Sequence, residues 1–415
     1  MKNPADKKYS LSKNKIRILL LEGVHENALK YFNENGYTNV EYIKSSLDNE
    51  LLIKKIKNVH MIGIRSRTHL TKEILNQAKL LIAIGCFSIG TNQVDLDYAK
   101  RKGIPVFNAP FSNTRSVAEL VISECIQLMR RIPERNLAAH EGNWLKDASS
   151  SFEVRGKNLG IVGYGHIGSQ VSILAESFGM NVFYYDIEKK LSLGNAKACS
   201  SLDELLKKSD IVTLHVPDTP LTRNMITRKE LSCMKKGSFL INASRGSVVN
   251  IEDLADSLES NRIGGAAVDV FPKEPKSNNE PFVSRLRKYP NVILTPHIGG
   301  STVEAQSSIA LEVSEKLVKY SDVGSTIGAT NFVEISLAPN YNKQRYLHIH
   351  ENKPGMLNKI TRVFLSRKIN IASQYLQTDS TLGYVIFDVD NKTNSSEILQ
   401  ELKSIRGTIK ARVLF

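Results

Sequence analysis

The chain has 415 residues, of which 41% are hydrophobic and 24% charged, a composition typical of ordinary globular proteins. At about 150 residues per domain, this length predicts two to three domains. No apolar run approaches the roughly 20 residues that a membrane-spanning helix needs. Residues 1–15 are Lys-rich without the apolar segment of a secretory signal, and the four cysteines are scattered. These features favour a cytoplasmic protein with neither a disulfide framework nor a metal site.

The formal net charge of +14 raises the question of a nucleic-acid partner. The basic residues are spread along the chain, and no dense Lys/Arg run is interleaved with aromatic residues. We therefore expect neither nucleic acid nor a membrane as a partner. We interpret the charge as a solvated surface that can attract an anionic substrate.

The first part of the chain alternates short apolar runs with helical patterns, which predicts parallel strands covered by helices. The runs lie at 16–21, 61–64, 80–84 and 104–107, and the helical patterns at 25–35, 48–57, 71–78 and 93–102. Arg65, Ser66 and Arg67 directly follow the second run, and ligands of open α/β sheets sit beyond the carboxyl ends of strands. Two guanidinium groups there suit a phosphate or a carboxylate. On placement alone, a solvated loop is an equal alternative.

After a long helix predicted at 113–131, the centre of the chain has the order strand, glycine turn, helix, strand, acid. These segments lie at 159–162, 163–168, 171–178, 181–185 and 186. Gly163, Gly165 and Gly168 have the G-x-G-x-x-G spacing, in which the glycines make a tight turn, admit a pyrophosphate and let helix and strand pack closely. The helix N-terminus offers free N–H groups to the phosphates. This context predicts a dinucleotide-binding Rossmann unit.

Asp186 decides which dinucleotide is expected. An acid about 20 residues after the glycine turn can accept hydrogen bonds from the adenosine ribose. Its charge would repel a 2′-phosphate, so NAD is favoured, although Lys189 and Lys190 lie close by and leave NADP open.

Four later strands carry polar residues at or just past their ends. The strands are predicted at 210–215, 238–242, 265–270 and 291–295, and the polar residues are His215, Ser244 with Arg245, Asp269 and His297. If the sheet is parallel, these ends converge at the same rim as the glycine turn. A nicotinamide bound at that turn would face them.

Oxidation of a secondary alcohol needs a base for the hydroxyl proton and a group that holds the substrate. Histidine is the natural acid/base near neutral pH, and a nearby carboxylate favours its imidazolium form. Arginine can hold a substrate carboxylate at two points. The rim offers His297, Glu274 and Arg245 for these roles. Each alone is more often structural, but their convergence beside a dinucleotide turn favours catalysis.

The sequence pattern changes toward the C-terminus. A helix is predicted from 301 to about 320, and a Gly-, Ser- and Asn-rich stretch follows it. Six further elements are predicted at 346–350, 356–365, 369–377, 383–390, 396–405 and 408–414. Their β-α-β-β-α-β order is that of a ferredoxin-like domain.

Together these motifs resemble the D-2-hydroxyacid dehydrogenase family, and within it the bacterial type with a C-terminal ACT domain. The resemblance covers the chain after its N-terminal tail. It rests on the glycine turn and on residues 65–68, 85–92, 107–110, 242–246, 268–275, 295–300 and 348–355.

The resemblance implies a fold of two doubly wound parallel-sheet α/β domains, one flavodoxin-like and one Rossmann, followed by the ferredoxin-like ACT domain. The implied boundaries are 1–112 with 301–330 for a discontinuous substrate-binding domain, 113–300 for the NAD-binding domain, 331–344 for a linker and 345–415 for the ACT domain.

The implied activity is NAD-dependent oxidation of 3-phospho-D-glycerate to 3-phosphohydroxypyruvate, the first step of L-serine biosynthesis. His297 would be the acid/base, Glu274 its partner and Arg245 the carboxylate clamp. NAD would be held by Gly163, Gly165, His166, Ile167, Gly168, Asp186, Ala243, Ser244, Arg245, Asp269, His297, Ile298, Gly299 and Gly300. The substrate would contact Arg65, Ser66, Arg67, Asn108 and, from a neighbouring subunit, Lys146.

The ACT resemblance further implies feedback inhibition by L-serine, bound by His350, Asn352 and Asn370, in a homotetramer. A tail that only mediates oligomerisation is the alternative. Two other functions also stay open: a reductase of another 2-oxo acid, such as 2-oxoglutarate or glyoxylate, and a dinucleotide-sensing binding protein like the corepressors that share this fold.

Overall fold

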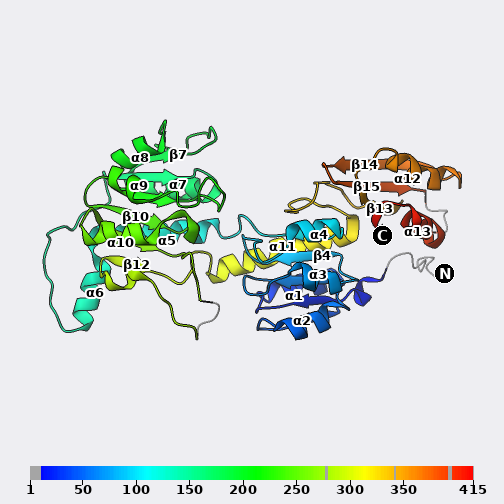
Figure 1. Cartoon of the computed structure of the whole chain (residues 1–415), viewed down its shortest axis with the longest axis horizontal. Coiled ribbons are helices and arrows are strands. Elements are labelled where there is room, and N and C mark those ends of the chain that lie inside the picture. The colour runs from blue at the N-terminus through cyan, green and yellow to red at the C-terminus, as the bar shows by residue number, and fades with distance from the viewer. Residues whose placement is uncertain (1–10, 276–278, 341–342, 391–394, 415) are drawn as a thin grey trace. The chain divides into compact units, whose positions relative to one another are not determined.

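The computed structural model describes residues 11–275, 279–340, 343–390 and 395–414. Most of the Lys-rich tail and residues 341 and 342 of the predicted linker therefore lie outside the described residues. The chain divides into two compact units, Met1–Ser112 with Gln306–Phe415, and Asn113–Ala305 (Figure 1). None of the helices in the described part of the chain is both long and apolar enough to cross a membrane.

The first unit begins with a five-stranded parallel sheet in the order β2-β1-β3-β4-β5. Its strands are β1 (Ile18–Leu20), β2 (Val40–Tyr42), β3 (Met61–Ile64), β4 (Ala83–Cys86) and β5 (Val106–Phe107). Its helices are α1 (Asn27–Glu34), α2 (Asn49–Ile56), α3 (Lys72–Gln77) and α4 (Leu96–Arg101), preceded by the 3-10 turn η1 (Lys13–Lys15). This is the predicted doubly wound, flavodoxin-like order. The edge strand β2 was not predicted, because two of its three residues are only partly buried and the third, the charged Glu41, is exposed.

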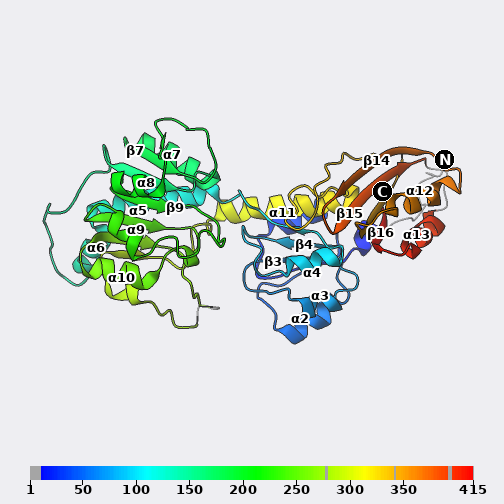
Figure 2. The ribbon, with the colours of Figure 1, turned by 45° about the horizontal axis from the view of Figure 1, so that its top comes forward.

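Both faces of this sheet are covered. Ile18 and Leu20 of β1 share a core with α1 and with the long helix α11 (Val303–Val323), whereas Leu19 packs with α2 and α3. Figure 1 and Figure 2 draw α11 in yellow beside the blue strands. A helix from much later in the sequence thus completes the core of the first sheet. This explains why β1 reads as a continuous apolar run rather than an alternating one.

The second unit contains a seven-stranded parallel sheet in the order β12-β11-β10-β9-β6-β7-β8. Its strands are β6 (Asn158–Val162), β7 (Asn181–Tyr185), β8 (Lys197–Ala198), β9 (Ile211–Leu214), β10 (Ser238–Asn242), β11 (Ile263–Val268) and β12 (Val292–Leu294). Helices α5 (Thr114–Arg130), α6 (Ile132–His140) and α7 (His166–Ser177) precede α8 (Leu202–Lys208), α9 (Arg228–Cys233) and α10 (Ile251–Glu259). The 3-10 turns are η2 (Gly246–Val248) and η3 (Arg285–Lys288). The strand order reverses between β6 and β9, where doubly wound sheets bind ligands.

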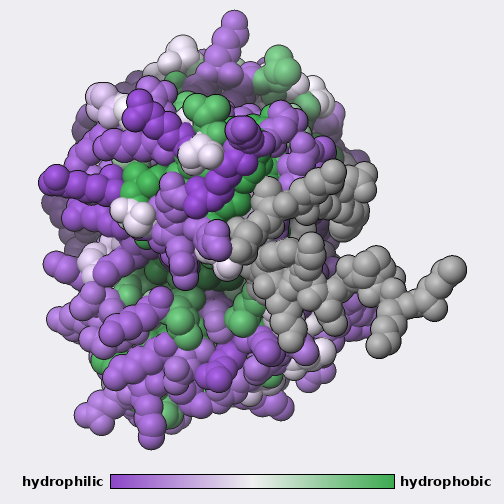
Figure 3. Space-filling model, turned by 90° about the vertical axis from the view of Figure 1, so that its right-hand side faces the viewer, coloured by the Kyte–Doolittle hydropathy of each residue, from purple (hydrophilic) through white to green (hydrophobic). Residues whose placement is uncertain are grey.

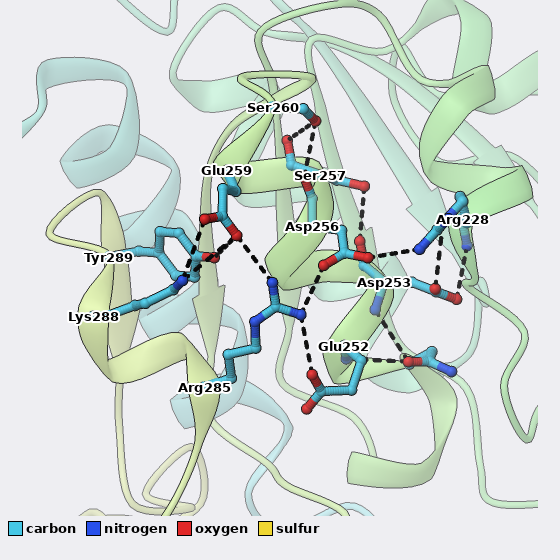
Figure 4. Close-up of polar contacts among 11 residues, drawn as sticks. Arg228, Glu252, Asp253, Asp256, Ser257, Glu259, Ser260, Arg285, Lys288 and Tyr289 are labelled. Carbon is cyan, nitrogen blue, oxygen red and sulfur yellow. Dashed lines mark hydrogen bonds and ion pairs between the residues drawn. The ribbon is translucent and has the colours of Figure 1, made fainter.

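On the outside of this unit, charged residues join α9, α10 and η3 (Figure 4). Arg285 contacts Glu252, Asp256 and Glu259, and Arg228 also contacts Asp256. These side chains are substantially exposed, and exposed ion pairs typically contribute at most about 1 kcal/mol each. We interpret this network as a tie between surface elements.

The C-terminal part of the first unit is a four-stranded antiparallel sheet in the order β14-β15-β13-β16. Its elements are β13 (Gln344–Glu351), α12 (Met356–Leu365), β14 (Ile371–Thr378), β15 (Leu382–Val389), α13 (Ser395–Ser404) and β16 (Thr408–Leu414). Tyr346 packs with α12 and α13, whereas Leu347 and Ile349 join the core that contains α1 and α11. The predicted ferredoxin-like order is confirmed.

The molecular face in Figure 3 is mainly hydrophilic, with hydrophobic residues in small groups.

One buried ion pair anchors the start of β13. Arg345 binds Asp388 of β15 at two points, with Nε–Oδ1 and Nη2–Oδ2 distances of 2.7 and 2.9 Å. The two side chains are only 4% and 1% exposed. The guanidinium also donates to the carbonyl oxygens of Val323 and Ala338, so it ties the last turn of α11 to this sheet.

We predict that Asp388→Ala lowers the free energy of unfolding by about 3–5 kcal/mol, because it leaves a buried guanidinium without its counter-charge. Urea unfolding monitored by circular dichroism measures this change. Glu315→Gln is the matched control, since it removes an exposed pair with Lys319 on α11 and should cost less than about 1 kcal/mol. Equal effects of the two substitutions would contradict the proposed anchoring.

Candidate active site

The glycine turn has the geometry of a dinucleotide cradle. Gly163 has φ +91°, and a Cβ atom there would lie 2.4 Å from the carbonyl oxygen of His215. A Cβ at Gly168 would lie 2.1 Å from the carbonyl oxygen of Gly163, so only glycine lets α7 approach the turn. Gly165 differs, since a Cβ there would meet nothing within 4 Å. The protein therefore leaves open space at the glycine whose backbone would face a pyrophosphate.

Helix α7 begins at His166, immediately after Gly165, and so includes the third glycine. The sequence pattern predicted a later start, at 171, because glycine disfavours helices. The earlier start points the free N–H groups of the first turn toward the space beside Gly165, where a phosphate would be stabilised. The residues thus fit a dinucleotide.

Asp186 follows β7 and is half-buried. Its carboxylate accepts hydrogen bonds from the backbone N–H groups of Tyr164, at 2.8 Å, and Glu188, at 2.9 Å. These two bonds fix the carboxylate against the glycine turn. A carboxylate has about four acceptor positions, so capacity remains for ribose hydroxyl groups.

The loop after β10 carries Arg245. Asn242 holds this loop, because its side-chain oxygen accepts from the N–H and hydroxyl of Ser244 and its amide nitrogen donates to the Arg245 carbonyl at 3.1 Å. Gly246 lets the loop pass close to Phe271, since a Cβ would lie 2.0 Å from the Phe271 carbonyl carbon. Burial lowers the pKa of Arg245, and nearby Asp218 and Glu274 oppose that shift. A partly desolvated guanidinium is well suited to bind a carboxylate.

Asp269 follows β11 and holds the turn that carries His297. Its carboxylate accepts hydrogen bonds from the Thr295 hydroxyl at 2.6 Å and from the N–H groups of Ile298 and Gly299 at 2.8 and 2.9 Å. Its carbonyl oxygen accepts from the His297 N–H at 2.8 Å. Asp269 is 2% exposed, and His297 has the left-handed φ of +55°. We infer that Asp269 stabilises this strained conformation and thereby orients the imidazole.

His297 and Glu274 form an ion pair at the rim. The imidazole Nδ1 lies 3.0 Å from Oε2 and 3.1 Å from Oε1 of Glu274. The hydrogen bond to Glu274 raises the pKa of His297, outweighing the lowering effect of burial. Burial alone would raise the pKa of Glu274, but His297 and the Phe271 N–H lower it overall. With Nδ1 engaged, Nε2 is free to exchange a proton with a substrate.

A buried acid beside this rim was missed from the sequence. Glu124 of α5 is 1% exposed, and neither carboxylate oxygen has a hydrogen-bond partner among the described residues. Burial and the charge of Asp269 raise its pKa to about 8, so the group is mainly protonated at neutral pH. The available signal was an acid within the apolar stripe of a helix, with Val121 one turn and Val117 two turns earlier.

The predicted anion-binding residues lie at the carboxyl ends of strands in the first unit. Arg65, Ser66 and Arg67 follow β3, with Arg65 half-buried and the other two exposed. Asn108 follows β5 and is buried, its side chain donating to the Ile89 carbonyl at 2.5 Å. Lys146 is exposed between α6 and β6 in the second unit. The backbone of the Arg65 loop is held by Glu22, which sequence reasoning also missed.

The predicted effector residues lie in the C-terminal sheet and its loops. His350 at the end of β13 is 3% exposed, and burial lowers its pKa. Gly383 makes room for its ring, because a Cβ there would lie 2.3 Å from Nε2. Asn352 is exposed and donates to the Asp379 carbonyl at 2.6 Å, and Asn370 is exposed. Within the described ranges, no cluster of three His, Cys, Asp or Glu side chains could hold a metal ion.

Comparison with known proteins places this geometry in a family. The NAD-binding domain of D-isomer specific 2-hydroxyacid dehydrogenases matches residues 122–299, and an acetohydroxyacid-synthase small subunit-like ACT domain matches residues 347–410. D-3-phosphoglycerate dehydrogenase of Escherichia coli K12 is 58% identical over 98% of this chain and 100% of the relative. That of Haemophilus influenzae is 57% identical over 98% and 99%. The chain belongs to the D-isomer specific 2-hydroxyacid dehydrogenases.

Solved structures agree with this family. D-Lactate dehydrogenase from Aquifex aeolicus, complexed with NAD and lactic acid, is 30% identical, with a TM-score of 0.65 over 73% of this chain and 95% of that chain. A glyoxylate reductase from Paecilomyces thermophila is 26% identical, with a TM-score of 0.66 over 76% and 98%. The second unit is accordingly the NAD-binding domain of an oxidoreductase, and the predicted family, cofactor and ACT domain are confirmed.

The turn geometry predicts that two glycines respond differently to alanine. Gly165→Ala should keep the thermal stability, since its φ is −84° and its Cβ has space, but weaken NAD binding about 10-fold, or by about 1.4 kcal/mol. Gly168→Ala should lower both the thermal stability and the NAD affinity. The clash with Gly163 should cost about 1–3 kcal/mol of stability. Calorimetric titration with NAD and thermal melts measure both effects. Normal NAD affinity of Gly165→Ala would remove this glycine from the phosphate site.

Proposed function

We propose that this protein oxidises 3-phospho-D-glycerate to 3-phosphohydroxypyruvate with NAD, the first step of L-serine biosynthesis. The observation that carries the proposal is the His297–Glu274 pair at 3.0 Å, on the same sheet edge as Arg245 and the glycine turn. The chain also aligns over almost its whole length with relatives named D-3-phosphoglycerate dehydrogenase.

The proposed cofactor contacts follow from the rim. The pyrophosphate lies at the turn formed by Gly163, Gly165 and Gly168, against the first residues of α7, His166 and Ile167. Asp186 receives the adenosine ribose hydroxyl groups. The remaining contacts come from the rim loops, at Ala243, Ser244, Arg245, Asp269, His297, Ile298, Gly299 and Gly300. Bound NAD supplies the acceptor for the hydride that leaves the substrate carbon.

His297 and Arg245 divide the remaining work in the proposed reaction. Neutral His297 takes the hydroxyl proton on Nε2 as the C–H bond releases its hydride and the C=O bond forms. Glu274 stabilises the resulting imidazolium through Nδ1. Arg245 holds the substrate carboxylate and so fixes the adjacent carbon. In the reverse direction, the imidazolium returns the proton to the carbonyl oxygen.

The proposed substrate has two anionic ends, a carboxylate and a phosphate. Arg245 would hold the carboxylate, while Arg65, Ser66, Arg67 and Asn108 would contact the phosphorylated end, joined by Lys146 of a neighbouring subunit. A phosphate accepts bidentate hydrogen bonds from guanidinium groups. Arg65 and Arg67 therefore favour 3-phosphoglycerate over plain hydroxy acids.

The pKa shift predicts the pH dependence of the oxidation. Its base is neutral His297, so kcat/KM should fall as the pH falls through the raised pKa. Glu274→Gln removes the main cause of that raised pKa, so the acidic limb of the profile should move to lower pH. His297→Ala should lower kcat by about 10²-fold or more, with the Kd for NAD much less affected. If Glu274→Gln left the pH profile of kcat/KM unchanged, this would contradict the pairing of Glu274 with His297.

Substrate identity is tested by NADH production with 3-phosphoglycerate, glycerate and D-lactate, and by NADH consumption with 2-oxoglutarate and glyoxylate. We expect kcat/KM for the phosphorylated acid to exceed that for glycerate by about 10²-fold or more, because glycerate leaves two guanidinium groups without a partner. Equal turnover of glycerate would contradict the phosphate assignment. Absence of NADH formation with every hydroxy acid would favour the dinucleotide-sensing alternative.

We further propose that L-serine inhibits the enzyme by binding at His350, Asn352 and Asn370 of the ACT domain in a homotetramer. An ACT domain supports regulation by a small molecule. Asn352 is exposed in a loop, which suits a ligand contact. Such inhibition is allosteric, since the site is separate from His297.

Titration of the 3-phosphoglycerate assay with L-serine tests this regulation, with Asn352→Ala as the variant. We expect the variant to need about 10-fold more serine for half inhibition, the effect of losing about 1.4 kcal/mol of binding energy. Its rate without serine should stay unchanged. Inhibition of the variant at the original serine concentration would place the effector site elsewhere.

A further inference from the structure

A buried glutamate connects two loops at the carboxyl end of the first sheet. Glu22 lies two residues after β1 and is 9% exposed. Its Oε1 accepts from the N–H groups of Arg65 at 3.2 Å and Thr68 at 2.8 Å, and its Oε2 accepts from that of Arg67 at 2.9 Å. One carboxylate thus receives three backbone N–H groups of the loop that follows β3.

Glu22 adopts a costly conformation to make these contacts. Its φ is +63°, in the left-handed region, which costs roughly 1–2 kcal/mol for a residue other than glycine. Backbone hydrogen bonds hold it there, from the Glu22 N–H to Ser45 at 3.1 Å and from the Gly23 N–H to Ile43 at 3.2 Å. A residue kept in a strained conformation by several contacts often serves a site.

The glutamate is one of two groups that hold Arg65 by its backbone. Its N–H is bound by Glu22, and its carbonyl oxygen accepts from Gln93 Nε2 at 2.7 Å. The side chains of Ser66 and Arg67 are exposed, so the loop backbone is fixed while its polar groups face outward. This arrangement orders the loop before any ligand arrives, which lowers the entropy cost of binding.

The charge of Glu22 also balances two cations. Burial lowers the pKa of Arg65, and the nearby charge of Arg67 lowers it further, whereas Glu22 acts in the opposite direction. Without that negative charge, the two guanidinium groups would repel each other and the loop would tend to open. A carboxylate on the backbone side of the loop can hold the arginines together while leaving their side chains available for an anion.

We propose that Glu22 is a positioning residue that orders the Arg65–Thr68 loop so that Arg65 and Arg67 can bind the phosphate of the substrate. The inference rests on the proposed function, which makes these arginines the phosphate contacts. Glu22 touches neither substrate nor cofactor in this role and acts through the three backbone N–H groups that it binds.

The test is Glu22→Gln, which keeps the shape of the side chain but replaces one accepting oxygen by an NH₂ donor and removes the charge. We expect the KM for 3-phosphoglycerate to rise about 10-fold or more, as loss of a hydrogen bond to a charged group implies. The KM for NAD and kcat should change little. Glu26→Gln is the matched control, because Glu26 is an exposed acid four residues later, and the KM of this variant should stay unchanged.

A mutant cycle with the Arg65→Gln/Arg67→Gln double variant separates positioning from general destabilisation. If Glu22 acts through the two arginines, Glu22→Gln should add little to the rise in KM that the double variant already causes. Independent effects would multiply instead. A purely structural loss would lower the amount of active enzyme and the Tm without a selective rise in KM.

The outcomes distinguish this inference from the function on which it rests. Unchanged KM for 3-phosphoglycerate in Arg65→Gln and Arg67→Gln would overturn the phosphate assignment, and the inference with it. A second case is that the arginine variants show a raised KM while Glu22→Gln shows a normal KM, or while its effect multiplies with theirs. Either result would overturn this inference and leave the phosphate assignment standing. If Glu22→Gln does not fold, Glu22→Asp replaces it, since it keeps the charge but is too short to reach all three N–H groups. It should raise the same KM, and an unchanged KM would again overturn the inference.

Discussion

The geometry of the rim depends on the hydrogen bonds that Asp269 accepts. Its carboxylate and carbonyl oxygen together bind Thr295, His297, Ile298 and Gly299, all from the segment that follows the neighbouring strand β12. This holds His297 at a positive φ, from which its ring reaches Glu274. Without Asp269, the left-handed conformation would lose its main support, and His297, the proposed acid/base, would lose its fixed direction.

Polar side chains also hold loops by hydrogen bonds where other strands end. Asp186 accepts from the N–H groups of Tyr164 and Glu188, the side-chain oxygen of Asn242 accepts from Ser244, and Glu22 accepts from the loop after β3. In each case a polar side chain just past a strand, or at its end, binds backbone N–H groups that regular structure leaves without partners. The loops proposed to bind ligands are thereby held at defined positions, as preorganised sites require.

The ACT domain shares a hydrophobic core with the rest of the first unit. Leu347 and Ile349 of β13 belong to the same core as α1 and α11. Arg345 adds a buried bond to the last turn of α11, at Val323. One face of the C-terminal sheet is therefore covered by its own helices and the other by the first domain. The proposed regulation would act through this shared core.

Much of the architecture was predictable from sequence because local patterns and the fold agree. The apolar runs gave most parallel strands, and each C-terminal element lies within two residues of its predicted bounds. The elements that escaped prediction are weakly patterned. Strand β8 has two exposed residues, and β2 is partly exposed, so neither has the apolar run that buried strands show. The first turn of α7 was not predicted, because its glycine has a low helix propensity. The geometry of the glycine turn outweighs that propensity.

By itself, the sequence determined the domain types, the dinucleotide turn and the residue types available at the strand ends, since these follow from periodicity, spacing and family resemblance. Only the tertiary structure decided which groups meet. Glu274 and His297 are 23 positions apart, and Glu22 and Arg67 are 45 apart, yet each pair is joined by a hydrogen bond. Burial was also decided at this level, since an acid in a helix, such as Glu124, is ordinary until packing removes its water and raises its pKa. Sequence patterns report which face of an element is apolar, but hydrogen bonds between loops depend on strand order and backbone conformation, which arise only when the chain is folded.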